Sequence, residues 1–582
     1  MFRKILPLVP YLRRYRRQFT WGALSILLAN GAWVLFPLVI ERAVDDLNHA
    51  VTREKILRFA LMLVGIALFK GVFLFFTRWI LIGISREIEF DLRNDLFATL
   101  ERQSPDYYQQ HRTGDIMARM TNDLNAVRML LGPAIMYSAN TIVFTIAALF
   151  FMAHISPRLT LYAFLPLPLA SLLIQTFGRK IHQRFERIQA MFSDISARAQ
   201  ENFSGARLVR AFAQEDYEAE RFENDNREYI NRSLPLARLT AMLWPALEFL
   251  LGLALVISLL IGGRMVVRHQ ISVGEFVAFN TYLMQLTWPM IALGWVVNLF
   301  QRGTASVMRI HELLIAQPTI DDVRADAALA GVRLRGDIEF RALGLSYGNT
   351  RVLQDVNLHV PAGTSLAIVG PTGSGKTTLV SLLPRLHDAT SGAVLLDGRD
   401  LREYPLDTLR SNIGFVPQET FLFSETIAEN IKLGAPDASE EDVEQAATAA
   451  HIAEDIRDFP RGFQTMVGER GITLSGGQKQ RTAIARALIR DSRILILDDA
   501  LSSVDTYTEE RILEDLRQRM IGRTTIFISH RVSTVRHADQ IAVLMDGRIV
   551  ELGRHEELIA KNGYYTSLWQ KQQLEEELAV AG

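Results

Sequence analysis

The sequence predicts an α-helical membrane domain of six transmembrane helices fused to a soluble α/β domain, and three observations support this fold class. Nearly all long apolar runs lie in the first 300 of the 582 residues. The rest of the chain alternates short Val/Ile/Leu-rich strands with charged helices, as soluble α/β domains do. A glycine-rich sequence of the kind that cradles phosphate groups follows one of these strands. A length prior of about 150 residues per domain suggests three or four units.

Charge and composition exclude several classes of protein and site. The formal net charge is −1 and the chain has no basic stripe, so we expect no nucleic-acid partner. Cysteine is absent, which excludes disulfides, thiolate metal sites and cysteine nucleophiles. The absence fits a large soluble part in a reducing cytosol, and a cysteine-poor lineage or an engineered sequence explains it equally well.

Six segments are expected to cross the membrane. The first, from Phe19 to Ile40, has 22 residues and no charge. About 20 apolar residues at 1.5 Å each cross the roughly 30 Å hydrocarbon core. The other five expected spans are Ile56 to Ser85, Met129 to Ala153, Leu159 to Gly178, Leu243 to Gly263 and Phe276 to Gln301. An even number of spans returns the carboxyl-terminal half to the side on which the chain begins.

The first 18 residues indicate which side that is. Six basic residues between Arg3 and Arg17 directly precede the first span, and the positive-inside rule places them in the cytosol. Apolar residues from Ile5 to Leu12 can lie in the interface while the arginines meet anionic lipid. A cleavable signal peptide would have a shorter apolar core and a small-residue cut site. We therefore expect a multi-pass protein of the inner (plasma) membrane with both termini in the cytosol.

The connections between the spans are unequal in length. Those expected outside are short: Glu41 to Lys55, His154 to Arg158 and Arg264 to Gln270. Those expected inside, about Arg86 to Arg128 and Arg179 to Leu239, are long and charged, and are predicted to be helices that continue into the cytosol. Their turning points, Thr113 to Asp115 and Arg207 to Phe212, are predicted to contact a cytosolic partner domain. The alternative is that they are solvated hairpin tips.

Some residues within the spans are candidates for a substrate path. Because polar groups are costly in hydrocarbon, four of them are functional candidates: Lys70, Glu248, Asn280 and Gln285. Six aromatic residues can line a path for bulky apolar compounds: Trp33, Phe36, Phe75, Trp79, Trp288 and Trp295. Helix packing and interfacial belts use the same residue types, and this second interpretation is favoured for the aromatic residues.

The carboxyl-terminal half contains a phosphate-binding loop. A buried strand is predicted at Ser365 to Val369, and it feeds into Gly370-Pro371-Thr372-Gly373-Ser374-Gly375-Lys376-Thr377. Lys376 is expected to contact the β/γ oxygens of ATP and Thr377 to coordinate Mg²⁺. Asp498, at the end of a second apolar strand, is placed to hold the Mg²⁺ shell. The predicted loop residues that bind nucleotide are Gly370, Thr372, Gly373, Ser374, Gly375, Lys376, Thr377 and Thr378.

A second motif, Leu474-Ser475-Gly476-Gly477-Gln478, lies downstream of this loop. With both motifs in this order the chain resembles a half-size ATP-binding cassette (ABC) exporter of the bacterial multidrug or lipid type, over essentially its whole length. The resemblance implies a type IV exporter membrane domain fused to a P-loop ATPase domain. It also implies that Ser475, Gly476, Gly477 and Gln478 contact the γ-phosphate of ATP held by the opposite subunit, in agreement with the free N–H groups and positive dipole of a helix start.

The resemblance assigns roles to further positions. Tyr347 is similar to the aromatic residue that stacks on adenine, the alternative being a packed strand tyrosine. Gln418 is similar to the glutamine that touches Mg²⁺ and the attacking water, and His530 to the switch histidine near the γ-phosphate. Asp505 resembles the acidic end of a loop that crosses the dimer interface. Gly468 to Gly471 resembles a contact to the partner's cytosolic helices.

Asp499 departs from the family pattern. Members with full hydrolytic power carry Glu directly after the metal-binding aspartate, where it polarises the attacking water. An aspartate is one methylene shorter, and displacing a catalytic carboxylate by about 1 Å can cost on the order of a hundredfold in rate. The resemblance therefore implies the degenerate-site subunit of a heterodimer whose homologous partner carries the Glu. The alternative is a homodimer in which Asp499 works through a bridging water or at reduced speed.

These features together predict the domain organisation and the activity. The expected parts are an interfacial helix (1–18), the transmembrane domain with its cytosolic extensions (19–315), a linker (316–335), the nucleotide-binding domain (336–575) and a tail (576–582). The resemblance implies ATP-driven export of small amphipathic or hydrophobic compounds by alternating access. A lipid flippase and a peptide exporter are alternatives within this class. Long regulatory insertions would favour an ATP-gated channel, and the sequence contains none. Six expected spans conflict with a soluble ATPase that remodels DNA or protein.

Overall fold

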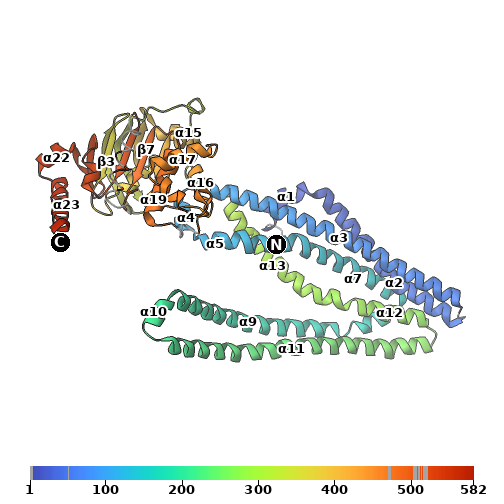
Figure 1. Ribbon diagram of the computed structural model, residues 1–582. Coiled ribbons are helices and arrows are strands. Elements are labelled where there is room, and N and C mark those ends of the chain that lie inside the picture. Colours follow the sequence, from blue (N-terminus) through green and yellow to red (C-terminus); the bar gives the residue numbers. More distant parts are fainter. Residues whose placement is uncertain are drawn as a thin grey trace. The chain divides into compact units, whose positions relative to one another are not determined.

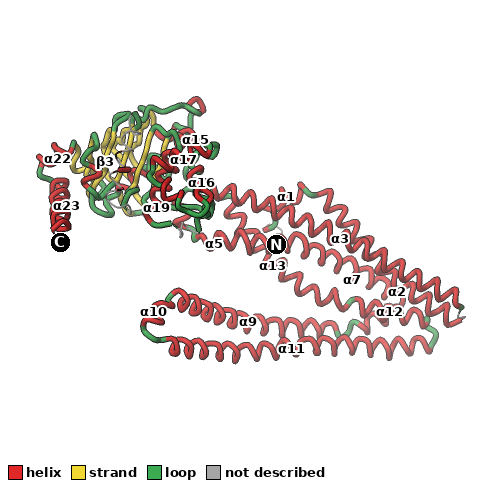
Figure 2. Tube along the Cα trace, in the orientation of Figure 1, coloured by secondary structure: helices red, strands yellow, loops and turns green. Residues whose placement is uncertain are grey.

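The computed structural model describes residues 4–49, 52–468, 474–502, 508, 511–512, 514 and 522–581. Its internal contacts divide the chain into two compact units. The helical unit comprises residues 1–100 and 114–316, and the ATPase unit, so named here for the predicted domain that it contains, comprises residues 101–113 and 317–582. Helices make up the first unit, whereas all strands lie in the second (Figures 1 and 2).

The helical unit is built from long helices, several of which exceed the thickness of a bilayer. Its helices are α1 (Val9–Arg14), α2 (Arg16–His49), α3 (Arg53–Glu101), α5 (Thr113–Ala118), α6 (Leu124–Met129), α7 (Ile135–Ile155), α8 (Pro157–Ala163), α9 (Leu167–Ser204), α10 (Ala206–Ala211), α11 (Glu215–Val267), α12 (Val273–Gln285) and α13 (Thr287–Leu314). Two π-helical segments, Arg119–Asp123 and Leu130–Ala134, connect α5, α6 and α7. Among the described residues, five helical stretches are long and apolar enough to cross a membrane.

Those five stretches correspond to five of the six predicted spans. They are Arg16–Asn48, Arg53–Glu101, Thr113–Ile155, Glu215–Val267 and Val273–Leu314. The segment predicted as one helix from Leu159 to Gly178 is instead interrupted, because α8 ends at Ala163 and α9 begins at Leu167. Pro166 lies in this break, and a proline cannot donate the backbone hydrogen bond that a continuous helix needs there.

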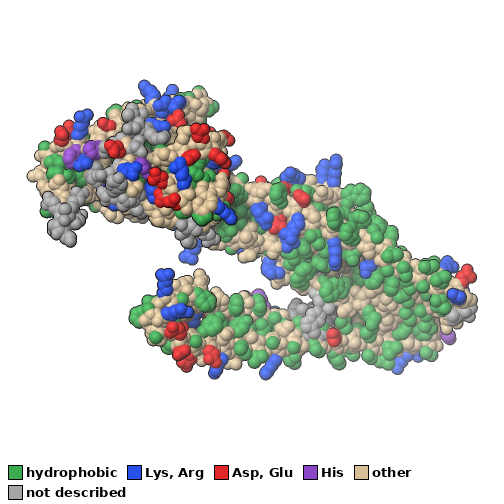
Figure 3. Space-filling view, viewed as in Figure 1, with side chains coloured by type: hydrophobic (Ala, Val, Ile, Leu, Met, Phe, Trp, Pro, Cys, Tyr) green, Lys and Arg blue, Asp and Glu red, His purple; other side chains and the backbone are tan. Residues whose placement is uncertain are grey.

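The predicted cytosolic extensions are helical. α3 has 49 residues and α11 has 53, so each is roughly 75 Å long at 1.5 Å per residue, more than twice the hydrocarbon thickness. α9 and α11 lie side by side and are joined through α10 (Figure 1). Hydrophobic side chains cover much of the visible surface of the helical unit, as lipid contact requires (Figure 3).

Buried polar contacts join the membrane-spanning helices. The Asn30 side chain on α2 donates to Asn140 Oδ1 on α7 at 2.8 Å, and the Tyr282 hydroxyl on α12 donates to the Val34 carbonyl at 2.6 Å. At the other end of α2, Asp45 accepts a hydrogen bond from the backbone N–H of Gly274 at 2.7 Å. Polar groups within a span have few alternative partners, so the bonds of Asn30 and Tyr282 fix how α2 packs on α7 and α12.

The ATPase unit contains two sheets. The larger has the strand order β10-β9-β3-β8-β7-β6, and its strands are β3 (Ser365–Val369), β6 (Ile413–Val416), β7 (Ile494–Asp498), β8 (Thr524–Ile528), β9 (Gln540–Met545) and β10 (Arg548–Gly553). All its pairs are parallel except β9 with β10. The smaller, antiparallel sheet has the order β2-β1-β4-β5, from β1 (Ile338–Tyr347), β2 (Thr350–Val360), β4 (Ser391–Leu396) and β5 (Arg399–Asp400).

The parallel sheet separates two hydrophobic cores. Alternate residues of β3 point to opposite faces, so that Ala367 and Val369 belong to one core whereas Leu366 and Ile368 belong to the other. Strands buried on both faces are continuous apolar runs, as the sequence of β3 predicts. The helices of this unit are α4 (Pro105–Gln110), α14 (Lys376–Ser381), α15 (Leu406–Ser411), α16 (Ile427–Lys432), α17 (Glu440–Ala449), α18 (Ala453–Arg457), α19 (Gly476–Leu488), α21 (Val532–Val535), α22 (His555–Lys561) and α23 (Tyr564–Ala581).

Candidate nucleotide-binding site

The predicted catalytic residues meet at one edge of the parallel sheet. The register pairs Ile368 of β3 with Ile528 of β8, and Ile528 with Asp498 at the end of β7. The phosphate loop therefore follows β3 at the edge where His530 follows β8. Gln418 follows the adjacent strand β6 at the same edge. Parallel strands place their carboxyl ends together, which is where α/β sheets bind ligands.

Glycine is required at two positions of the phosphate loop. Gly370 has a φ of 151°, and a Cβ there would lie 2.1 Å from the carbonyl oxygen of Leu544. Gly375, the residue before α14, has a φ of 100° that L side chains rarely adopt. The Ser374 hydroxyl is buried and has no hydrogen-bond partner among the described residues. A buried donor without a partner, in a loop that opens onto a helix start, fits a bound phosphate group.

Lys376 is held inside this loop. Its Nζ donates to the carbonyl oxygens of Gly370 and Pro371, both at 2.9 Å, and the residue is only 7% exposed. Burial lowers the pKa of its ammonium group, while the carboxylates of Asp498 and Asp499 oppose that shift. The lysine is thus positioned beside both acidic groups of the site.

Asp498 has the environment of a metal ligand. It is 1% exposed, and both of its oxygens are buried without a well-formed hydrogen bond to any described residue. Burial raises its pKa, with Asp499 adding to the effect and the nearby Thr377 side chain and Lys376 opposing it. A buried carboxylate beside a hydroxyl offers the hard oxygen ligands that Mg²⁺ prefers, and Mg²⁺ in nucleotide sites typically uses only one or two protein ligands. These residues therefore fit a bound Mg²⁺.

Asp499 and His530 line the same small cavity. This cavity has a volume of about 250 Å³ and is bounded by residues that follow β7 and β8. The backbone N–H of Asp499 donates to the Ile528 carbonyl at 3.0 Å, and its φ of 48° turns the chain sharply after Asp498. Aspartate tolerates this left-handed conformation better than most residues. Gln418 is exposed at the same sheet edge.

Tyr347 ends β1 and packs against a histidine. Its ring meets the His387 ring edge to face with 5.4 Å between centroids, and it is 38% exposed. Burial raises the pKa of Tyr347, and a hydrogen bond to the Thr378 side chain opposes that shift. Tyr347 is therefore held by Thr378 of α14 and by His387. The rest of its ring stays accessible to a nucleotide base.

The second motif begins a well-capped helix. Ser475 is the N-cap of α19: its hydroxyl accepts from the Gln478 N–H at 3.3 Å, and its own N–H donates to Gln478 Oε1 at 3.0 Å. Gln478 Nε2 also donates to Asp455 at 3.0 Å. Ser475 and Gly476 are exposed, so this helix start is open to solvent. Two further predicted contacts, Asp505 and residues 469–471, lie outside the described residues.

Sequence reasoning missed one connection to this site. His387 Nδ1 lies 3.0 Å from Asp106 Oδ1 on α4, and the Ser104 hydroxyl lies 2.8 Å from that of Thr319. These contacts lie earlier in the chain than Thr113 to Asp115, where a contact was predicted, because α3 ends at Glu101 and a separate helix begins at Pro105. Neither Asp106 nor His387 has a local sequence signature, so no pattern could have found the pair.

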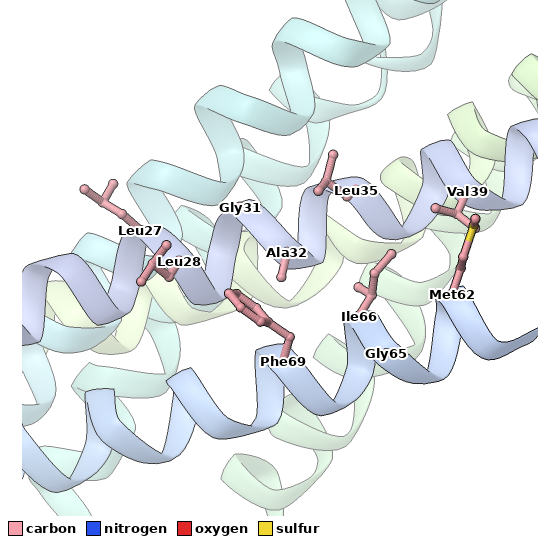
Figure 4. A pocket seen from close by; sticks show the side chains of 10 residues that line it. All are labelled: Leu27, Leu28, Gly31, Ala32, Leu35, Val39, Met62, Gly65, Ile66 and Phe69. Atoms are coloured by element: carbon pink, nitrogen blue, oxygen red, sulfur yellow. The ribbon is translucent and has the colours of Figure 1, made fainter. Parts of the chain in front are cut away.

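A candidate apolar pocket lies between α2 and α3 in the helical unit (Figure 4). Its volume is about 580 Å³, and its lining includes Leu27, Leu35, Ile66 and Phe69, so it can accept only hydrophobic groups. Of the predicted path residues, Lys70 places its Nζ 3.0 Å from the centre of the Trp33 ring. None of the six predicted aromatic residues lines this pocket.

Comparison with known proteins identifies the family. The transmembrane region of ABC transporters matches residues 19–290, and the ABC transporter ATPase model matches residues 353–502. The chain is 38% identical to a probable multidrug resistance ABC transporter ATP-binding/permease protein, YheI of Bacillus subtilis, over 99% of this chain and 98% of that protein. It is 37% identical to the multidrug resistance-like protein MdlA of Escherichia coli (98% and 96% covered) and 36% identical to a lipid A-core flippase of Syntrophus aciditrophicus (99% and 95%).

A solved structure agrees with this assignment. A bacterial Atm1-family ABC exporter with ATP bound superimposes with a TM-score of 0.79 at 29% identity, over 96% of this chain and 98% of that one. The match confirms the predicted fold class, a helical membrane domain of the type IV exporter kind fused to an α/β ATPase domain. The chain belongs to the ABC transporter family and is a half-size ABC exporter that carries its membrane domain and its ATPase domain on one polypeptide.

Proposed function

We propose that this chain uses ATP to export amphipathic or hydrophobic compounds of the multidrug type, as one half of a dimer with two ATP sites. The observation that carries this proposal is the convergence of the phosphate loop, Asp498 and His530 on one sheet edge, while Ser475 faces outward at a helix start. One chain thus offers a phosphate cradle and, separately, an exposed helix start that would meet a second nucleotide. Two such chains, facing each other, would each complete the other's site.

The proposed hydrolytic machinery is Asp499, His530 and Gln418 acting on ATP held by the phosphate loop. Thr377 and Asp498, with Gln418, would hold Mg²⁺, which neutralises charge on the β/γ oxygens when it is bound. Lys376 would contact the same oxygens. Ser374 and Thr378 would donate from the loop, and Tyr347 would stack on the adenine. Ser475 to Gln478 would contact the γ-phosphate on the partner's nucleotide.

Asp499 makes this site slow in the proposed mechanism. Its carboxylate is one methylene shorter than that of Glu, so its distance to the attacking water increases. We propose a heterodimer in which the partner's phosphate loop and Glu carry most of the turnover and this chain supplies Ser475 to Gln478. A homodimer with Asp499 as the working base is the second candidate.

The proposed membrane arrangement follows from the charge pattern. Both termini and the ATPase unit would lie in the cytosol, with the chain embedded in the inner (plasma) membrane. The proposed domains are 1–18, 19–315, 316–335, 336–575 and 576–582. Residues Arg207 to Phe212 would contact the partner's ATPase domain. Closure of the two ATPase domains around ATP would then pull the cytosolic helix ends together, because contacts to both sides of the nucleotide exist only in the closed dimer.

The proposed substrate class is supported by the relatives named for multidrug resistance and by the apolar pocket between α2 and α3. A lipid flippase is the alternative that a specific observation favours, since the relative from Syntrophus aciditrophicus is named as one. Transport of a fluorescent lipophilic cation and of a labelled lipid into inside-out vesicles distinguishes the two. Uptake of the lipid alone would replace the multidrug proposal with the flippase.

Hydrolysis rates test the slow site directly. The chain is purified alone and with its candidate homologous partner, and Asp499→Glu and Asp499→Ala variants are compared in both preparations. We expect activity to appear in the mixture, to survive Asp499→Ala and to be lost with the partner's Glu. Asp499→Glu should raise the rate of the chain alone by about ten- to a hundredfold. Rapid turnover by the unsubstituted chain alone would contradict the asymmetric pair.

A further inference from the structure

The loop that carries His530 receives two hydrogen bonds from a distant side chain. Gln572, on the carboxyl-terminal helix α23, donates through Nε2 to the carbonyl oxygen of His530. Its Oε1 accepts from the N–H of Val532 at 2.6 Å. The primary amide thereby pairs with the backbone on both sides of Arg531, as a neighbouring strand would.

These two bonds act on a stretch that lies outside regular secondary structure. β8 ends at Ile528 and α21 begins at Val532, so residues 529–531 belong to neither element. Within this stretch, the Arg531 N–H donates to the Ser529 hydroxyl at 3.0 Å. Ser529 is buried, whereas His530 is exposed at the sheet edge. Gln572 therefore fixes the backbone of His530, whose imidazole is exposed.

α23 is anchored firmly enough to do this. Tyr565 is fully buried, and its hydroxyl lies 2.7 Å from His555 Nδ1 on α22. Leu568 and Trp569 pack against the same hydrophobic core. Tyr565, Trp569 and Gln572 are spaced by four and three residues, so they share one helix face, which points toward the core. The position of Gln572 is thus set by the apolar packing of α23 on this core, which also includes Val532 directly after the loop.

We propose that Gln572 is a positioning residue for ATP hydrolysis, which holds the His530 loop so that the imidazole faces the γ-phosphate position. The inference rests on the proposed role of His530 and extends the nucleotide site to a helix beyond the region that the ATPase family model matches. Loss of the two bonds would let the loop shift, and displacements of about 1 Å at a reacting centre cost up to roughly a hundredfold in rate.

The test compares variants of the full-length transporter reconstituted in liposomes. Gln572→Met keeps the length of the side chain but removes both hydrogen bonds, and Gln573→Ala, on the exposed face of the same helix, is the matched control. We expect Gln572→Met to lower the kcat of this chain reconstituted alone about three- to thirtyfold, with the KM for ATP and the unfolding temperature nearly unchanged. In a His530→Ala background, Gln572→Met should cause no further loss, because the group it positions is gone.

The outcomes separate this inference from the proposed function. A normal rate in Gln572→Met, or a further loss in the His530→Ala background, would overturn the positioning role alone. A normal rate in His530→Ala would overturn both the positioning role and the proposed role of His530. If the chain hydrolyses ATP only when it is assembled with its partner, the same variants are compared in that mixed assembly by photo-cross-linking. The measured quantity is the amount of azido-ATP that stays bound to this chain in the presence of Mg²⁺. The variants are expected to rank in the same order.

Discussion

The short helices α4 and α10, which follow the long helices α3 and α9, differ in the contacts that their side chains make within the chain. α4 belongs to the ATPase unit, where Asp106 meets His387 and Ser104 meets Thr319. α10 belongs to the helical unit and, like α4, has no buried residue of its own. Three large apolar side chains there are mostly exposed: Phe203 (81%), Leu208 (64%) and Phe212 (68%).

The difference indicates which contacts one chain can make alone. α4 forms polar contacts within the ATPase unit, whereas Phe203, Leu208 and Phe212 are not covered by the described residues of the helical unit. Outside a bilayer, clusters of exposed apolar side chains mark sites of association. Together with the exposed start of α19, this supports a second subunit as the missing cover. The comparison therefore shows polar contacts of α4 within its own chain and leaves the proposed contact of α10 with a partner to be tested.

The largest expected effect tests the α10 half of the comparison. Leu208→Asp with Phe212→Asp places two charges on the surface proposed to meet the partner. We expect transport to fall at least tenfold, because a charge buried in an apolar contact costs several kcal/mol. Vesicle uptake measures transport, and cross-linking between subunits measures assembly.

The control for this prediction introduces the same charge nearby. Ala219→Asp lies on an exposed position of α11 outside α10, and it should leave uptake within about twofold of the unsubstituted protein. If the α10 variant transports normally, the exposed apolar residues are a solvated tip. The proposed difference between α4 and α10 would then be wrong, because neither helix would contact a partner subunit.

A smaller effect is expected at α4, where His387 connects Tyr347 to Asp106. Asp106→Asn should weaken the ion pair, and His387→Phe should keep the ring contact with Tyr347 but remove the polar one. Part-exposed ion pairs contribute about 0.2–1 kcal/mol, so we expect two- to fivefold weaker stimulation of ATPase activity by substrate. The KM for ATP should change in His387→Ala, which loses both contacts, more than in His387→Phe.

A double-mutant cycle provides the decisive comparison for this pair. Asp106→Asn in the His387→Phe background should add little, because the partner is already removed. Independent effects of the two substitutions would show that the residues act separately. In that case α4 would be held on the ATPase unit chiefly by other contacts.

The nucleotide site could be predicted from sequence because its signals are local. A buried strand, a glycine loop and Lys376 occupy consecutive positions, and Asp498 ends a strand whose apolar run identifies it. Parallel pairing then brings these strand ends together without further information. His387 and Gln572 could not be predicted, since each is a single polar residue whose partner is far away in the sequence. The break after Ala163 was missed because hydropathy outweighed the signal from Pro166.

The smallest expected effect concerns the hydroxyl pair of Ser104 and Thr319. Both oxygens lie 2.8 Å apart, but Thr319 is exposed, so water can replace the lost partner in Ser104→Ala. A neutral hydrogen bond of this kind contributes about 0.5–1 kcal/mol, and we expect substrate-stimulated ATPase activity to change less than twofold. Thr319→Val, which keeps the shape and removes the hydroxyl, should match it. An effect as large as that of Asp106→Asn would mean that the hydroxyl pair holds α4 to its own chain as strongly as the ion pair does.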